Sequence, residues 1–252
     1  MFDRQMRREA PADAPEARIE HVGGVVRHVG TDHGWNGILW SDLDSGTADA
    51  AIREQIAHFT SLGREFEWKL YAHDRSADLA DRLRAAGFTP EPEETLMVAR
   101  IAELPTDVAP PDGIELRPVT DAAGVALLAD VHQQAFGTDA SHWRQLLDQL
   151  QRQPDTVAAV VAMAGEEPVS GARMEFPPGA EFASLWGGGT VPAWRGRGVY
   201  RSLVALRAQA AAERGYRYLQ VDASDQSRPI LQRLGFVPLT TTTPFVYDPA
   251  AR

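Results

Sequence analysis

The stretch of this chain best suited to chemistry is a turn of two arginines and two glycines: Arg195, Gly196, Arg197 and Gly198. Residues 186–191 before it read as a strand that Pro192 ends, and apolar residues recur at helical spacing from Val199 onward. The amino end of a helix presents unpaired N–H groups, and its dipole favours anions. Glycine lets a phosphate approach the main chain, and arginine donates to phosphate oxygens. The pattern favours a phosphate site, with an ordinary strand-to-helix turn as the alternative.

Two other phosphate-binding patterns are disfavoured. A dinucleotide-binding G-x-G-x-x-G would need a third glycine where Arg201 stands. No G-x-x-x-x-G-K-[ST] occurs, and Lys69 is the only lysine of the chain. No G-x-S-x-G occurs either, which disfavours an acyl hydrolase.

The segment from Ser184 to Phe236 resembles the GNAT acetyltransferase superfamily, whose acetyl-CoA loop reads [QR]-x-x-G-x-[GA] between a strand and a helix. Arg195 and Gly198 match this loop, whereas Tyr200 stands where the family has a small residue. The family's next strand, short helix and Gly-Phe are matched downstream, ending at Gly235-Phe236. The resemblance covers about residues 113–247 and implies an α/β (α+β) fold with a mixed, mostly antiparallel sheet flanked by helices.

The resemblance also implies a set of acetyl-CoA contacts. The loop, from Arg195 and Gly196 onward, would hold the pyrophosphate through the amides of Arg197, Gly198, Val199 and Tyr200. The pantetheine arm would pair with Gly189, Thr190 and Val191, and the thioester oxygen would face an amide near Val191. Ser224 stands where the family often has Asn. Leu231 stands where it often has the Tyr that protonates the leaving thiolate.

Three residues are candidates for the chemistry of acetyl transfer to an amine. Glu175 and Asp222, on strands that flank the expected cleft, could act as the base, although a salt-bridged structural carboxylate is an alternative for each. Tyr200 could replace the missing acid, or could simply pack. The loop at residues 136–139 would border the acceptor.

A shift of 148 residues superimposes the first half of the chain on the second. Asp74 then falls on Asp222, and Gly87-Phe88 falls on Gly235-Phe236. The sequence thus indicates two tandem GNAT-like units. The first has Thr47-Ala48-Asp49-Ala50 in place of the Arg/Gly turn, so we expect it to be degenerate and not to bind CoA.

The expected organisation is a flexible tail at residues 1–17, the degenerate unit at 18–103, a proline-rich linker at 104–113 and the acetyl-CoA-binding domain at 114–252. Strands at Val237–Thr241 and Pro244–Tyr247 would close the sheet of the second unit.

Composition narrows the class of protein. The net charge of −10 over 252 residues disfavours binding to nucleic acid or to an anionic membrane. The chain has no cysteine, no H-E-x-x-H and no long apolar run, so we expect no disulfide, no metal and no membrane span. A cytoplasmic location is expected.

The sequence therefore predicts an N-acetyltransferase that moves an acetyl group directly from acetyl-CoA to the amine of a small-molecule or peptide acceptor. Two alternatives stay open: a CoA-binding sensor without turnover, and a structural or partner-binding module. The identity of the acceptor and the oligomeric state are left undetermined.

Overall fold

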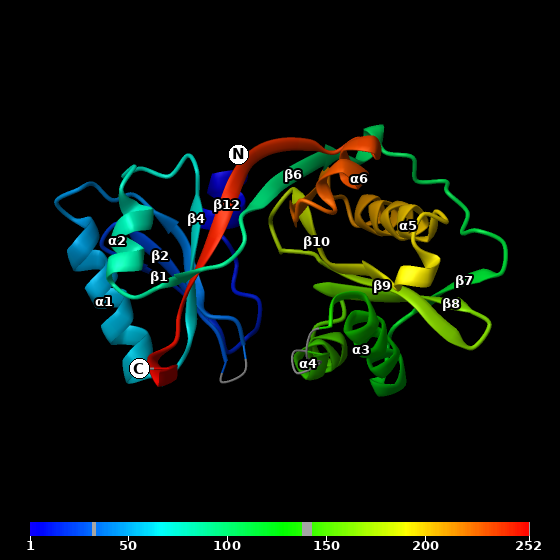
Figure 1. Ribbon diagram of the computed structural model, residues 1–252, viewed down its shortest axis with the longest axis horizontal. Helices are drawn as coiled ribbons and strands as arrows, with labels where there is room; N and C mark the ends of the chain where they lie inside the picture. Colours follow the sequence, from blue (N-terminus) through cyan, green and yellow to red (C-terminus); the bar gives the residue numbers. More distant parts are fainter. Residues whose placement is uncertain (32–33, 138–142, 252) are drawn as a thin grey trace. The chain divides into compact units, whose positions relative to one another are not determined.

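The computed structural model describes residues 1–31, 34–137 and 143–251, which divide into two compact units (Figure 1). Unit 1 comprises Met1–Met97, Asp222–Pro229 and Pro238–Arg252, and unit 2 comprises Val98–Val221 and Ile230–Val237. Both units therefore draw on segments that are far apart in the sequence. The expected domain boundaries, at residues 18–103 and 114–252, stay a prediction.

Unit 1 is an open sheet in the order β1-β2-β3-β4-β12. The chain runs through η1 (Asp3–Arg8), β1 (Arg18–Val22), β2 (Val25–Val29), β3 (Gly37–Ser41), α1 (Ala48–Ser61), β4 (Phe66–Tyr71), α2 (Leu79–Ala85), β5 (Thr89–Pro90) and β6 (Glu94–Arg100), and returns with β12 (Val237–Tyr247) and η4 (Pro249–Ala251). The β3–β4 pair is parallel, and the β1–β2, β2–β3, β4–β12 and β5–β12 pairs are antiparallel.

Helices α1 and α2 pack on one face of this sheet and complete its core (Figure 1). Phe59 of α1 stacks on Phe66 of β4 with ring centroids 4.4 Å apart, and Phe88 meets Phe66 edge-on. Aromatic rings bury large apolar areas, and both arrangements suit their quadrupoles.

Strand β12 pairs with a different unit from the one the sequence led us to expect. Residues 237–247 form one strand, and its residues from Thr242 to Tyr247 run antiparallel to Tyr71–Phe66 of β4. Its Phe245 is buried in the core of unit 1. The expectation that these residues close the second unit's sheet is therefore wrong, because alternating residues predict a strand without naming its partner.

The first residues also differ from the expected flexible tail. Residues 3–8 form the short helical turn η1, and its Arg7 is only 1 % exposed. A buried guanidinium needs hydrogen-bond partners on every side, and unit 1 supplies them.

Unit 2 is an open sheet in the order β11-β10-β9-β8-β7. Its elements are η2 (Ile101–Glu103), β7 (Ile114–Pro118), α3 (Ala122–Phe136), α4 (Trp143–Arg152), β8 (Val157–Ala164), β9 (Glu167–Glu175), β10 (Phe182–Thr190), η3 (Pro192–Trp194), α5 (Val199–Glu213), β11 (Tyr218–Ala223) and α6 (Arg228–Arg233). The end of β11, from Asp222, and the start of α6, up to Pro229, belong to unit 1. Helices α3 and α4 cover one face of the sheet, and α5 covers the other (Figure 1). Strands β8 and β9 form an antiparallel hairpin.

The same order of elements occurs twice. In the first half, α1 joins the parallel neighbours β3 and β4 and α2 follows; in the second, α5 joins the parallel neighbours β10 and β11 and α6 follows. In unit 2 the β7–β8, β8–β9 and β9–β10 pairs are antiparallel, as are the four antiparallel pairs of unit 1. The predicted fold class, a mixed and mostly antiparallel sheet flanked by helices, is confirmed.

Because Phe245 is a core residue of unit 1, Phe245→Ala should lower the free energy of unfolding by about 3–5 kcal/mol. Denaturant unfolding followed by tryptophan fluorescence measures the loss. The control is Val237→Ala at the exposed start of the same strand, which should cost less than about 0.5 kcal/mol. Equal losses for the two variants would contradict the placement of β12.

Candidate functional site

The candidate site begins where two parallel strands part. Strands β10 and β11 are paired only from Phe182–Tyr218 to Ser184–Gln220, yet β10 continues to Thr190 and β11 continues to Ala223. Beyond the last pair the facing edges of the two strands have lost their ladder. Strand β10 is therefore splayed from its parallel neighbour before it reaches the Arg/Gly turn.

A β-bulge bends β10 just beyond this point. Its register with β9 shifts between Trp186 and Gly189, and Gly187 has a φ of +57°. A bulge of this kind places an extra residue in one strand and re-aims its edge. The bulge therefore directs β10 away from β11 as it approaches the Arg/Gly turn.

The turn itself presents open amides. Gly196 and Gly198 have φ values of +75° and +89°, and Gly198 is the N-cap of α5. The backbone N–H groups of residues 196–201 have no hydrogen-bond partner among the described residues, and the next amide, of Ser202, donates to Gly198 O. The chain therefore offers an anion a row of donors at the positive end of a helix dipole.

The two arginines of the turn have different contacts. Arg195 donates from Nε to Thr190 O at 3.1 Å and from Nη2 to Ala135 O at 3.0 Å. It thus ties the turn to β10 and to the end of α3. The guanidinium of Arg197 lies 4.7 Å from the centre of the Trp194 ring and is exposed, so Arg197 is the better placed of the two to meet a phosphate.

The corresponding turn of unit 1 is closed by its own side chain. Asp44 Oδ1 accepts from the amides of Gly46 and Thr47 at 2.9 and 3.0 Å, and Asp44 O accepts from the amide of Ala48. Hydrogen bonds from Thr47 and Gly46 lower the pKa of Asp44, so its carboxylate stays charged. The amides of residues 46–48 are thus already bonded to Asp44, whose carboxylate would also repel a phosphate at this turn.

The comparisons with known proteins now bear on this geometry. Residues 125–236 match the model of the acetyltransferase (GNAT) family. This part of the chain is a GNAT acetyltransferase domain. A search of the curated proteins finds no match.

Solved structures resemble the chain over nearly its whole length. A GCN5-related N-acetyltransferase from Kribbella flavida has a TM-score of 0.70 at 20% identity, over 91% of this chain and 89% of its own. A functionally unknown conserved protein from Staphylococcus epidermidis reaches 0.64 at 12% identity, over 93% and 95%. A tandem GNAT protein from the clavulanic acid biosynthesis pathway reaches 0.61 at 14% identity, over 96% and 85%. At these identities the likeness concerns the fold.

Within the GNAT domain, the backbone expected to bind pantetheine is partly engaged. Gly189 O accepts from Ser170 Oγ at 2.6 Å, and Thr190 O accepts from Arg195. A carbonyl can accept a second bond, so these two oxygens can still serve a ligand. The Val191 amide donates to Val169 O at 3.0 Å and has no second hydrogen to offer, so it is not available to a thioester oxygen.

The aromatic residue of the GNAT loop lies against the bulge. A Cβ added at Gly188 would be 2.9 Å from Cε2 of Tyr200, so the glycine makes room for this ring. Tyr200 also acts electrostatically on Arg207, whose guanidinium is buried in α5. Burial lowers the pKa of Arg207 and Tyr200 opposes that shift. Leu231, in the family's usual tyrosine position, is completely buried.

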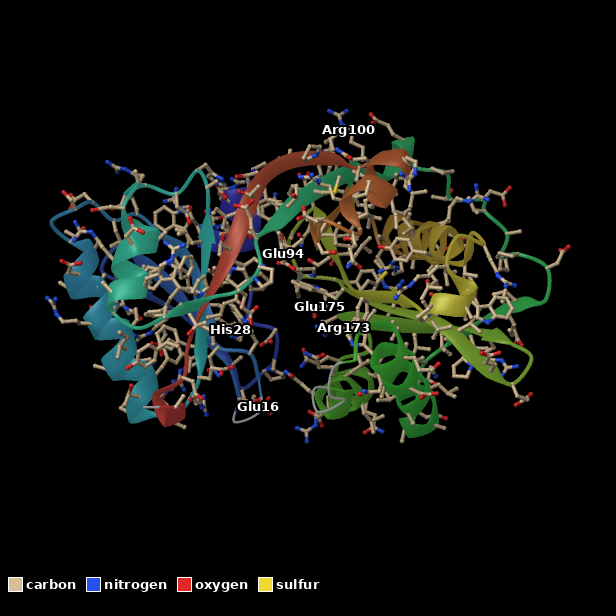
Figure 2. All side chains as sticks on the ribbon, viewed as in Figure 1. Glu16, His28, Glu94, Arg100, Arg173 and Glu175 are labelled. Carbon is tan, nitrogen blue, oxygen red and sulfur yellow. The ribbon has the colours of Figure 1, made fainter. Side chains whose placement is uncertain are left out.

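The carboxylates expected near the cleft are both paired. Glu175 Oε1 lies 3.0 Å from Nη1 of Arg173, two residues away on β9 (Figure 2). Asp222 is 2.7 Å from Nζ of Lys69, and its side chain is only 4% exposed. This ion pair is compatible with the structural alternative, and a role of Asp222 as the base stays a prediction. Ser224 is exposed and accepts from the Ser227 amide in the turn before α6.

One acidic residue of unit 1 was not singled out from the sequence. Glu94 on β6 (Figure 2) has an oxygen 3.9 Å from Lys69 Nζ. Burial, reinforced by Asp222 and opposed by Lys69, raises the pKa of Glu94 to about 7. Asp222 is the closer partner and raises the pKa of Lys69 against the effect of burial. The isolated lysine was the one sequence signal that could have pointed to this cluster.

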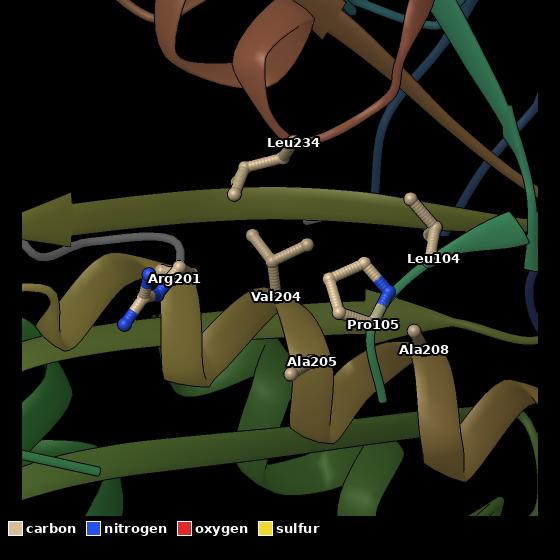
Figure 3. Close-up of a pocket in the computed structure, with 7 residues that line it drawn as sticks. All are labelled: Leu104, Pro105, Arg201, Val204, Ala205, Ala208 and Leu234. Atoms are coloured by element: carbon tan, nitrogen blue, oxygen red, sulfur yellow. The ribbon is translucent and has the colours of Figure 1, made fainter. Parts of the chain in front are cut away.

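The remaining features of the structure add little evidence for a ligand site. The depression between α5 and residues 104–105 (Figure 3) has a volume of about 10 Å³ and is lined by aliphatic carbon, which suits packing rather than a ligand. In the described part of the chain no group of three or more His, Asp or Glu side chains could hold a metal, and no helix is long and apolar enough to cross a bilayer. Residues 138 and 139, expected to border the acceptor, lie outside the described residues.

The raised pKa of Glu94 predicts a pH dependence of stability. The folded state holds this proton up to about pH 7, whereas the unfolded chain releases it near pH 4.3. The stabilisation is therefore complete below the lower value and is lost as the pH rises through 7. Glu94→Gln cannot titrate, so the Tm of the wild type should fall relative to this variant between pH 5 and pH 8. The exposed neighbour Glu93 is the control: Glu93→Gln should track the wild type.

Proposed function

We propose that the chain is an acetyl-CoA-dependent N-acetyltransferase whose GNAT domain binds the CoA pyrophosphate on the open amides of residues 196–201. The observation that carries the proposal is the contrast between the two turns. The amides before α5 have no partner among the described residues, whereas those before α1 are occupied by Asp44. One cofactor site per chain, in the second half, follows from this contrast.

The reaction would proceed by direct transfer. The neutral amine of a small-molecule or peptide acceptor attacks the thioester carbonyl, a C–N bond forms, and the C–S bond breaks to release CoA thiolate. The nitrogen must lose a proton and the thiolate must gain one. Because the Val191 amide is already engaged, this scheme assigns no polarisation of the carbonyl to it.

Tyr200 is the proposed proton donor to the thiolate. Leu231 cannot donate a proton, whereas the Tyr200 ring lies against Gly188 at the bulge of β10. The buried guanidinium of Arg207 faces the phenol and would stabilise the negative charge that remains when the proton leaves. Glu175 stays the proposed base on this domain, although its ion pair with Arg173 must open first.

A CoA-binding sensor without turnover is the second candidate. The observation that favours it is that a buried leucine, Leu231, stands in the family's usual tyrosine position. The usual acid is therefore missing, while the cofactor turn is unchanged. A sensor would bind acetyl-CoA and would release no thiol with any amine. A cytoplasmic location and the absence of a metal stay predictions for either candidate.

Gly198→Asp should weaken acetyl-CoA binding by at least about 100-fold in calorimetry. The new carboxylate would lie among the phosphate-binding amides, and repulsion at about 4 Å is worth a few kcal/mol near a protein surface. Gly165→Asp is a matched control, because Gly165 also has a positive φ, +62°, but lies in the β8–β9 turn. Equal affinity of the two variants would place the phosphate site elsewhere.

Tyr200→Phe should keep acetyl-CoA affinity within about twofold, because the loop binds through its backbone. It should lower kcat by about 100-fold or more, since a positioned acid contributes that much. Thiol release with a panel of amines measures the rate. Tyr216→Phe, which loses only a hydroxyl bonded to Pro177 O, should retain full activity. A Tyr200→Phe enzyme as fast as the wild type would remove the acid role.

A further inference from the structure

Unit 1 contains a strand gap of the same kind as the one beside the cofactor turn. Strands β3 and β4 are paired in parallel only at Gly37–Glu67 and Ile38–Trp68, and both strands continue beyond the last pair, to Ser41 and Tyr71. The backbone that follows therefore needs other partners. In the repeated order of elements, this gap corresponds to the one between β10 and β11.

The chain fills this gap with its own first residues. Arg7 of η1 donates from Nε to the carbonyl oxygen of Leu39, the first residue of β3 beyond the last ladder pair, at 2.9 Å. Its guanidinium lies 3.9 Å from the centre of the Tyr71 ring. An arginine side chain thus contacts both of the strands that have parted.

The other nitrogens of Arg7 are bound as well. Nη2 donates to both oxygens of Asp74 at 2.7 Å, and Nη1 donates to Asp3 Oδ1 at 3.0 Å. Asp74 also accepts from the Tyr71 amide at 3.0 Å, which fixes its orientation. Nε, Nη1 and Nη2 thus each meet a different acceptor, namely Leu39 O, Asp3 and Asp74, and a compact ammonium cannot reproduce this planar arrangement of donors.

We infer that the strand gap of unit 1 is a guanidinium-binding site, occupied in this chain by Arg7 as an internal ligand. The site consists of Asp74, the Tyr71 ring and Leu39 O, with Asp3 closing it from the ligand's own segment. It lies where the repeat would otherwise provide a cofactor cleft, so occupation by Arg7 and closure of the turn by Asp44 both exclude CoA from unit 1. The inference goes beyond the proposed function, because it needs no catalysis in unit 2.

The test uses the full chain with Arg7→Ala, which leaves a site of guanidinium shape. The Tm should fall by roughly 5–10 °C, because an unpaired buried Asp74 is costly. Ethylguanidinium at millimolar concentration should raise the Tm of this variant and leave the wild type unchanged. Ethylammonium, of equal charge and similar size, should rescue much less. Arg4→Ala is the control, since that side chain is 62% exposed.

Three results would overturn the inference. They are an unchanged Tm in Arg7→Ala, a fall no larger than that of Arg4→Ala, and rescue by the two cations to the same extent. Arg7→Lys separates shape from charge: it should keep the positive charge yet recover less than half of the lost Tm. Full recovery with lysine would show a simple ion pair instead. None of these readouts uses acetyl-CoA, so their failure is distinguishable from failure of the proposed enzyme.

Discussion

Parallel strands that part are the constraint on which both halves of this molecule depend. A strand pair that separates leaves N–H and C=O groups without a ladder partner, and such groups must find another partner, water or a ligand. Unit 1 meets the requirement internally, with Arg7 on Leu39 O and Asp44 on the turn amides. Unit 2 leaves the amides before α5 open. The same architecture is therefore closed in one half, whereas the other half leaves its turn amides open.

The electrostatics of the repeat follow from two equivalent aspartates. Asp74 and Asp222, which are 148 residues apart, are both buried, and each is neutralised by a cation: Arg7 for the first and Lys69 for the second. Burial raises the pKa of Glu94, and Lys69, which lies 2.7 Å from Asp222 but 3.9 Å from Glu94, offsets only part of that rise. Equivalent positions in the two halves thus share a buried carboxylate that is paired with a cation.

Features that are local in the sequence could be predicted, and features set by distant contacts could not. The Arg/Gly turn, the strand that precedes it and the helix α5 that follows it each depend on glycines, prolines and apolar spacing within a few residues. The burial of Arg7 depends on Asp74, 67 residues away, so a polar segment looked like a tail. The pairing of β12 with β4 and the engagement of the Val191 amide by Val169 O are likewise invisible in a single segment.

The tyrosine in the cofactor turn and the glycines of β10 explain one another. A Cβ at Gly188 would clash with Tyr200, and one at Gly189 would lie 2.6 Å from the Phe136 ring. The bulge is therefore packed by aromatic rings on side chains from α5 and α3 rather than by its own side chains. A small residue at position 200, as in the family's loop, would leave the space over Gly188 empty. The departure from the family pattern at Tyr200 is thus accommodated by a glycine in the strand, and the two together bring a phenol against the bulge of β10.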